Sequence, residues 1–510
     1  MTTTPLMRTD AAADTTASSL PGIWRREVGA VALGFVVLEL AMSARYGFHR
    51  DELYFLACAR HLSWGYVDQP PFVPTVGWIA AHLFGTSPTS LRIFPALAGG
   101  AAVVLSALMA RELGGRRKAQ FLAALAAATS PQVLAACHLL STAAFDMFFW
   151  AALCFLWLRL LRTGEQRLWL VIGAVTGLAL LNKLNVVFLL VGLIAGVLAA
   201  GRGQVLLNRR AALGAIVALV IWSPNIVWNA QHDWAVLSML RSLHQENSSL
   251  GASIGFIPSQ LIVVGPVLIV LWLAGLRYLL ASSFAKPIGL AYGVVVVLFT
   301  LSGAKPYYLA GMYFVLFAAG GVWAERRLER REPAKGVRGW TLMMAAGGVA
   351  ALPLVLPVLP QSTLPAGSWE GTINKDLSAT VGWHDFVHQI AGVSKTLRAN
   401  ERANLVVFTG DYGAAGAIDL WGAQYGLPHA TSGHNTYWWW GPPEPRNGTT
   451  TIAVDVPRPY LLTIFSEVTA AGSVHTPGGV WTEERGDPIW ICRGQTKTWT
   501  QAWSAARHYG

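Results

Sequence analysis

Two adjacent carboxylates follow the first long apolar segment of the chain. Asp51 and Glu52 lie in the run His-Arg-Asp-Glu-Leu-Tyr, which ends at Tyr54. A carboxylate at a membrane surface can take a proton from an acceptor hydroxyl or amine. Ionisable groups near a bilayer are costly and are often functional. The pair could also serve only to cap a helix, because the helix dipole favours carboxylates at its N-terminus.

Two further aspartates come at the ends of apolar segments. Asp68 and Gln69 precede Pro70-Pro71, which fix an extended turn and hold the aspartate in place. Asp146 opens the fourth long apolar segment. Asp68 could be a simple turn residue and Asp146 a helix N-cap, so both interpretations remain open for each residue.

Basic residues at segment ends offer phosphate contacts. Lys183 follows one apolar segment, and Lys305 precedes Pro306-Tyr307-Tyr308. Lysine is a good point-charge partner for a lipid phosphate, and Tyr307 or Tyr308 could hold a phosphate or stack on a sugar. Alternatively, both lysines only extend toward the membrane interface.

A divalent-metal site is conceivable in the loop over 230–256. His232, Asp233, His244 and Glu246 could join Asp68 around an ion. Their spacing matches no standard zinc motif. Solvated loop residues are the competing interpretation, and no cofactor is certain.

Composition defines the broad class. The chain has 510 residues, 54% of them hydrophobic and 13% charged, with a net charge of +11. A disordered chain, a coiled coil and an ordinary soluble enzyme are excluded. The basic residues punctuate apolar runs instead of forming a stripe, so no nucleic-acid partner is expected.

The apolar runs predict a polytopic α-helical membrane protein. A span needs about 20 mainly apolar residues, and about eleven such segments are found. They lie near 28–45, 91–111, 119–137, 145–162, 168–182, 185–200, 211–229, 257–280, 287–302, 307–324 and 340–360.

Charge asymmetry predicts the orientation. If residues 1–27 form a cytoplasmic tail, the inside segments carry 21 basic residues and the outside loops before residue 361 carry seven. The positive-inside rule therefore favours this topology for the membrane part, residues 28–360. The long first outside loop, 46–90, contains two stretches, 53–62 and 72–83, that could lie as amphipathic helices along the interface.

Residues 361–510 differ in character and are expected outside the membrane. Turn clusters separate apolar runs at 404–409 and 451–456, which are typical of buried strands. A helix is expected at 412–425 between them. The sequence thus predicts an extracytoplasmic α/β domain.

In their order and sidedness, these motifs resemble the family 39 glycosyltransferases of the GT-C fold. The resemblance rests on Asp51-Glu52 with Tyr54, the Asp68-x-Pro-Pro turn, Asp146, Lys183 and the Lys305-to-Tyr308 run, over about residues 28–325. That family includes protein O-mannosyltransferases and aminoarabinose transferases that modify lipid A. The resemblance implies transfer of a sugar from a polyprenyl-phosphate carrier to an acceptor outside the cytoplasmic (inner) membrane, usually with inversion.

The resemblance also implies residue roles. Asp51 would be the catalytic base and Asp146 a second acidic site residue, while Lys183 would hold the leaving phosphate. Asp68 would lie near any metal, with His244 as a metal-proximal residue. Many aminoarabinose transferases have a lysine where this chain has Gln69, so one phosphate contact is in doubt. Three basic residues could substitute for it: Arg50, Arg60 and Lys305.

Two other classes compete with a glycosyltransferase. A secondary transporter would place polar residues near the midplane of broken, internally repeated spans, whereas here the carboxylates gather near one interface and no repeat is visible. A non-catalytic membrane scaffold would present the C-terminal domain to a partner. The sequence does not identify the sugar or the acceptor, which could be a protein, a lipid, a glycan or a small molecule.

Overall fold

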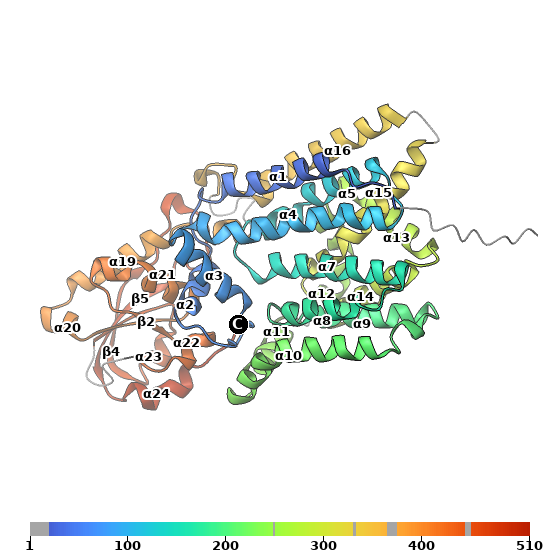
Figure 1. The fold of residues 1–510 in the computed structure, drawn as a ribbon. Helices are drawn as coiled ribbons and strands as arrows, with labels where there is room; N and C mark the ends of the chain where they lie inside the picture. The colour runs from blue at the N-terminus through green and yellow to red at the C-terminus, as the bar shows by residue number, and fades with distance from the viewer. Residues whose placement is uncertain (1–19, 248–249, 330–332, 365–374, 444–449) are drawn as a thin grey trace, which may run out of the picture.

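A helical bundle and a sheet domain lie end to end in the computed structural model (Figure 1). The structure describes residues 20–247, 250–329, 333–364, 375–443 and 450–510. The bundle is formed by α1 (Arg25–Met42), α4 (Pro88–Glu112), α5 (Arg117–Thr129), α6 (Pro131–Cys137), α7 (Thr142–Thr163), α8 (Leu168–Leu180), α9 (Val186–Ala199), α10 (Arg209–Gln231), α12 (Leu250–Val264), α13 (Ile269–Ala281), α14 (Lys286–Ser302), α15 (Tyr313–Glu329) and α16 (Pro333–Val355). Short helical turns connect them: η1 (Gly203–Val205), η2 (Pro266–Leu268), η3 (Pro306–Met312) and η4 (Gln361–Thr363).

Each predicted span position is helical, but the lengths support a smaller count. Within the described residues, five helices are long and apolar enough to cross a membrane, or up to seven if each of two bent pairs is one span. The bends lie at Pro131, between α5 and α6, and at Pro266, after α12. Proline cannot donate an intrahelical hydrogen bond, which explains the breaks. Helices α8, α9 and α14 are shorter apolar helices. The multi-span fold is therefore confirmed, and the number eleven stays a prediction.

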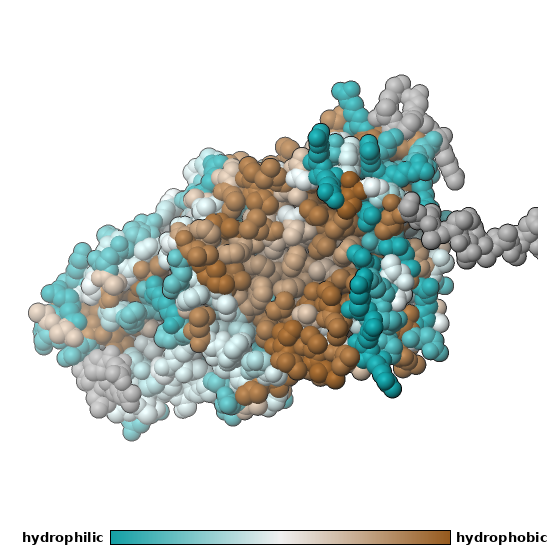
Figure 2. Space-filling view, in the orientation of Figure 1, coloured by the Kyte–Doolittle hydropathy of each residue, from teal (hydrophilic) through white to brown (hydrophobic). Residues whose placement is uncertain are grey.

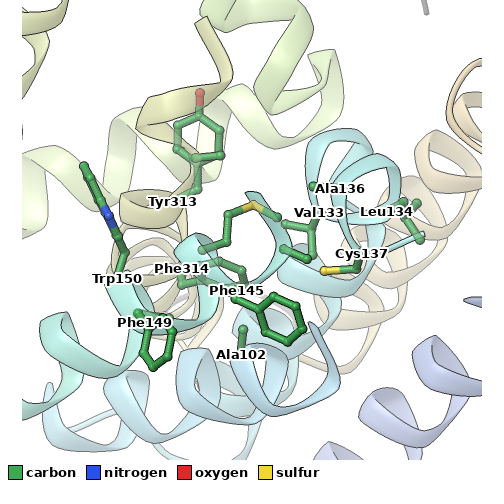
Figure 3. Close-up of a cluster of buried hydrophobic side chains, with 14 of the residues drawn as sticks. Ala102, Val133, Leu134, Ala136, Cys137, Phe145, Phe149, Trp150, Tyr313 and Phe314 are labelled. Atoms are coloured by element: carbon green, nitrogen blue, oxygen red, sulfur yellow. The ribbon is translucent and has the colours of Figure 1, made fainter. Parts of the chain in front are cut away.

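Small residues let the bundle helices approach closely. A Cβ atom at Gly196 of α9 would stand 2.1 Å from the carbonyl oxygen of Pro287 in α14, and one at Gly275 of α13 would stand 2.0 Å from that of Leu316 in α15. Only glycine allows such backbone contact between helices. Aromatic side chains of α7 then fill the centre, where Phe145 and Trp150 lie with residues of α4, α6 and α15 (Figure 3).

The surface of the bundle is divided into an apolar band and a charged end. Figure 2 shows brown side chains over the bundle and teal ones at the end far from the sheet domain. Exposed apolar residues such as Val220 of α10 and Leu301 of α14 belong in contact with lipid, not water. At the charged end, Arg116 pairs with Glu329 and Arg162 with Glu112. Segments predicted to share one side of the membrane therefore meet at one end of the bundle.

Two helices of the first predicted loop, α2 (Arg50–Arg60) and α3 (Phe72–Phe84), lie between the bundle and the sheet domain (Figure 1). The expectation that the first stretch lies along the membrane interface as an amphipathic helix is wrong. Residues from Glu52 to Ala59 of α2 are all buried, because α3 covers one side of the helix and the C-terminal domain covers another.

The C-terminal domain has a five-stranded sheet in the order β2-β1-β3-β5-β4. Strand β1 is parallel to β2 and β3, whereas β5 is antiparallel to β3 and β4. Its elements are α18 (Lys375–Ser378), α19 (Trp383–Thr396), α20 (Ala399–Ala403), β1 (Leu405–Thr409), α21 (Tyr412–Trp421), η5 (Gly422–Tyr425), β2 (Ala430–Ser432), α22 (Asn435–Trp439), β3 (Thr450–Val454), α23 (Arg458–Leu461), β4 (Phe465–Ser473), η6 (Pro477–Gly479), β5 (Pro488–Gln495) and α24 (Trp499–Ala506). The two predicted strands and the helix between them are confirmed.

Alternate residues of the central strands point to opposite faces of this sheet. Val407 of β1 packs on the side of α19 and α21, in the core that continues into the bundle. Phe408 points to the other face, against Trp499 and Trp503 of α24. Because α21 also packs on α2, one face of the sheet is joined to the membrane part.

Candidate active site

The site is built on the first turn of α2. His49 is the N-cap: its Nδ1 accepts the backbone N–H of Asp51 at 3.1 Å, while its own backbone N–H donates to Glu52 Oε2 at 2.8 Å. This reciprocal arrangement satisfies two backbone donors at the helix start. It also separates the two carboxylates, because successive helix positions do not share a face.

Glu52 points into the bundle, where Arg92 of α4 holds it. Arg92 Nε donates to Oε1 at 2.9 Å and its Nη2 donates to Oε2 at 2.7 Å. Oε1 also accepts the backbone N–H of Leu140, at 3.0 Å. The Glu52 side chain has no solvent exposure. A carboxylate so fully engaged is suited to fixing α2 against α4 and the start of α7, and it presents no free face to a substrate.

Asp51 points the other way and stays open to solvent. Its side chain is 37% exposed. The hydroxyl of Tyr412, the first residue of α21, donates to Asp51 Oδ1 at 2.9 Å. Arg50 Nε lies 3.8 Å from the same oxygen. Asp51 is thus the carboxylate of the pair that an acceptor could reach.

Tyr54, one turn further along α2, joins the proline turn to the C-terminal domain. Its hydroxyl lies 2.7 Å from both Asp68 Oδ1 and Thr436 Oγ1. Burial raises the pKa of Asp68 to about 6, and the hydrogen bond from Tyr54 opposes the rise. At neutral pH the carboxylate is therefore charged but held in a poorly solvated place.

Gln69, the next residue, is buried with 3% exposure, and neither its amide oxygen nor its amide nitrogen has a hydrogen-bond partner within the described parts of the chain. Buried amides are normally paired, since an unpaired polar group costs about 1–3 kcal/mol. Gln69 is therefore available to bind a polar ligand group beside Asp68.

A second acidic and basic pair lies across the site. Asp146 lies just after the first turn of α7, whose N-cap is Ser141, and its Oδ2 accepts a hydrogen bond from Asn185 Nδ2 at 2.9 Å. The charge of Lys183 also acts on this carboxylate. Lys183 Nζ stands 4.3 Å above the ring of Tyr308 and 5.6 Å from that of Tyr307. Cation–π contact holds the ammonium group of the lysine in front of the two tyrosines.

A backbone hydrogen bond joins the two halves of the site: Phe72 N donates to Leu181 O at 3.0 Å and ties the proline turn to the segment that carries Lys183. Four predicted site residues lie around η3 and the beginning of α7: Asp146, Lys183, Tyr307 and Tyr308. Asp51 lies at the start of α2.

Other predicted contacts lie elsewhere or are already engaged. Arg60 is at the far end of α2, about 14 Å along the axis from Asp51 at 1.5 Å per residue, and donates to the carbonyl of Asp419 at 2.7 Å. Arg50 forms an ion pair with Glu483 of the C-terminal domain. Lys305 is an exposed N-cap of η3. For Arg60, the geometry gives no support to a donor-phosphate contact.

The predicted metal site gains no support from the described residues. Among them, no group of three or more His, Cys, Asp or Glu could hold a metal ion. His244 lies in α11 (Ala235–Asn247), and its side chain is outside what the structure describes. Next to Asp68 stand Tyr54 and Thr436, which suit hydrogen bonding to a substrate.

Several residues of the site could not be found from local patterns. Tyr412 and Thr436 come from the C-terminal domain, more than 350 positions from Asp51 and Tyr54. Arg92 is one of several arginines near segment ends, and nothing in its neighbourhood marks it as the partner of Glu52. Asn185 follows Lys183 by two residues, a polar position inside an apolar segment that could have indicated a paired role.

Comparisons with known proteins bear on the class to which this fold belongs. Residues 68–228 match the family described as dolichyl-phosphate-mannose-protein mannosyltransferase. The chain is 27% identical to the lipid A galacturonosyltransferase RgtD of Rhizobium johnstonii over 354 residues, 66% of this chain and 72% of that protein.

The fold matches that of ArnT from Cupriavidus metallidurans. The apo structure superposes with a TM-score of 0.62 at 16% identity, covering 91% of this chain and 97% of that one. The structure bound to undecaprenyl phosphate gives a TM-score of 0.60 at 18% identity, with the same shares covered.

These findings define the class: the chain is a membrane-embedded glycosyltransferase of the GT-C type that depends on a lipid-linked sugar. The match of residues 68–228 to the dolichyl-phosphate-mannose-protein mannosyltransferase family agrees with the resemblance that the order of the sequence motifs indicates.

Proposed function

We propose that this chain transfers a sugar from a polyprenyl-phosphate carrier to an acceptor at the outer surface of the cytoplasmic membrane, with inversion at the anomeric carbon. The observation that carries the proposal is the placement of Lys183 over the rings of Tyr308 and Tyr307 together with a solvent-accessible carboxylate, Asp51, at the start of α2. The carboxylate can accept a proton and the lysine can receive a phosphate.

The reaction follows from these two groups. The acceptor hydroxyl or amine attacks the anomeric carbon and gives its proton to Asp51. The bond between that carbon and the phosphate oxygen breaks, and the electron pair leaves with the lipid phosphate. Lys183 stabilises the developing phosphate charge, and stabilisation of charge in the transition state is a large part of catalysis. Asp146, which accepts a hydrogen bond from Asn185, adds a negative charge near Lys183.

Other predicted residues are assigned to substrate contacts. Gln69 would bind a sugar or phosphate oxygen beside Asp68, and Lys305 would meet the phosphate from η3. Glu52 would position α2 and take no part in proton transfer, since its oxygens are engaged by Arg92 and Leu140.

The relatives suggest which substrates to try first. RgtD is named for lipid A, so a glycolipid of that kind is our first candidate acceptor. Undecaprenyl phosphate is bound in one ArnT structure and is our first candidate carrier. The membrane topology that goes with this function has eleven spans, a cytoplasmic N-terminal tail over 1–27, the membrane part over 28–360 and an extracytoplasmic domain over 361–510.

The decisive experiment uses the full-length chain in detergent or lipid nanodiscs. It is incubated with lipid A and a panel of undecaprenyl-phosphate sugars that includes a neutral hexose, a uronic acid and an aminopentose. Release of undecaprenyl phosphate from one donor, dependent on acceptor, is expected. The Asp51→Asn variant should be folded and inactive, whereas Lys286→Ala, at the opposite end of the bundle, should be active. Full activity of Asp51→Asn would overturn the base assignment.

A further inference from the structure

The C-terminal domain places a tyrosine against the proposed base. Tyr412 begins α21, where Asp411 is the N-cap: its Oδ1 accepts the backbone N–H of Gly413 at 2.6 Å and of Ala414 at 3.3 Å. Capping of this kind fixes the first turn of a helix. The Tyr412 side chain therefore projects from a rigid first turn of α21.

Close contact between helices fixes where that helix start lies. A Cβ atom at Gly413 would stand 2.8 Å from Arg50 Cβ, and one at Gly416 would stand 2.8 Å from the carbonyl oxygen of Leu53. The two glycines form one small face of α21 and allow it to touch α2. Any larger residue would push Tyr412 away from Asp51.

The ring and the hydroxyl of Tyr412 are both constrained. The ring lies between Tyr54 and His434, with centroids 4.7 Å from each. Burial, and next the charge of Asp51, raise the pKa of Tyr412 well above its ordinary value. The hydroxyl therefore stays protonated and can donate to the carboxylate.

Among the residues that the structure describes, hydrogen bonds from side chains engage one oxygen of Asp51. Tyr412 holds Oδ1, while Oδ2 lies 3.8 Å from His49 Nδ1. That nitrogen already accepts the backbone N–H of Asp51, so it carries no proton toward Oδ2. The carboxylate is held by one oxygen and presents the other.

We propose that Tyr412 is a positioning residue of the active site: it orients Asp51 so that Oδ2 faces the acceptor, and the C-terminal domain thereby completes the catalytic centre. The proposal rests on the base role proposed for Asp51. A misplaced base loses rate without losing donor affinity, because proton transfer depends on alignment of the reacting atoms.

The test compares Tyr412→Phe with a matched control, Tyr437→Phe. Tyr437 is also a buried tyrosine of this domain, and its hydroxyl donates to Asp419 Oδ2 at 2.8 Å. We expect Tyr412→Phe to lower kcat by about 10- to 100-fold with the KM for the donor within about twofold, and Tyr437→Phe to change kcat by less than about threefold. Equal kcat values for the two variants would overturn the proposal.

A second pair of variants distinguishes a loss of positioning from a folding defect. Tyr412→His keeps a ring between Tyr54 and His434 and keeps an N–H donor, whereas Tyr412→Leu has neither. A higher kcat for Tyr412→His than for Tyr412→Leu, at equal thermal stability, supports positioning, and equal kcat values overturn it.

The parallel Asp51→Asn measurement separates the role of Tyr412 from the base role of Asp51. If that variant is inactive while Tyr412→Phe is normal, only the role of Tyr412 fails; if Asp51→Asn turns over, the base assignment fails.

Discussion

Arg92 of α4 and Glu52 of α2 form a two-point ion pair that is closed to solvent on both sides, with side-chain exposures of 2% and 0%. Arg92 also donates to the carbonyl oxygens of Ser43 and Gly47, at 2.5 and 2.7 Å. The arginine thus holds both the end of α1 and the start of α2. Asp51 directly precedes Glu52 in α2, so its orientation depends on this anchor.

Breaking the anchor should destabilise the fold. We expect Glu52→Gln or Arg92→Met alone to lower the free energy of unfolding by about 3–5 kcal/mol, because each leaves a buried charge without its partner. Thermal unfolding in detergent measures the effect. The exposed pair Arg116 and Glu329 is the control, and Arg116→Ala should cost less than about 1 kcal/mol. Equal losses for the buried and the exposed pair would contradict this expectation.

Lys183 should determine affinity for the donor phosphate. Hydrogen bonds to charged groups contribute about 1.5–3 kcal/mol, so Lys183→Ala should raise the KM for the polyprenyl-phosphate sugar by roughly 10- to 100-fold. Lys183→Arg retains a cation and should lose less. Titration with undecaprenyl phosphate as a product inhibitor provides an independent affinity. Unchanged affinity in Lys183→Ala would remove this residue from the site.

The carboxyl group of Asp68 should make stability depend on pH. Burial raises its pKa to about 6 in the folded protein, above the value of about 3.9 for an unperturbed aspartate. The folded state therefore binds the proton more tightly than the unfolded state does, and the Asp68 contribution to stability falls as pH rises from about 4 to 6. Asp68→Asn removes this contribution.

The measurement for Asp68 is the difference in melting temperature between the native protein and Asp68→Asn at several pH values. Burial also raises the pKa values of Asp455 and Asp487, to about 6 and about 7. Since those groups are present in both proteins, their effect cancels in the difference. We expect the variant to gain in relative stability as pH rises through this window, and a pH-independent difference would contradict the assignment.

Sidedness can be tested by labelling single cysteines. All four native cysteines are buried and free, so they should not react in folded protein. Ser504→Cys in α24 and Ser283→Cys in the turn between α13 and α14 are at exposed positions near opposite ends of the molecule. In spheroplasts, a membrane-impermeant maleimide should label Ser504→Cys only. Labelling of Ser283→Cys only would invert the proposed topology.

Local sequence patterns predicted the helices and strands better than they predicted which elements pack against one another. The strands β1 and β3 and the helix α21 lie where apolar runs and turn residues place them, because these signals are carried by neighbouring positions. The break at Pro131 follows from the missing N–H of proline in the same way. The burial of α2 could not be foreseen, since the helix that covers it is more than 350 residues away in the sequence.

The same distinction applies to the site. Asp51, Asp146, Lys183 and Tyr307 are polar residues at ends of apolar segments, a position that marks them in the sequence. Tyr412 carries no such mark, because it lies in a domain where tyrosines serve as ordinary core residues. Tyr412 belongs to the candidate site because its hydroxyl lies 2.9 Å from Asp51 Oδ1.

The close fit of Gly413 and Gly416 against α2 has a consequence for how the protein matures. A ribosome makes α2 early and α21 late, so a nascent chain that has already inserted its helices still lacks Tyr412 and Thr436 beside Asp51 and Tyr54. In the proposed topology, the proposed catalytic centre would assemble only when the last segment has crossed the membrane and docked. Unfinished or truncated chains would be unable to consume the lipid-linked sugar.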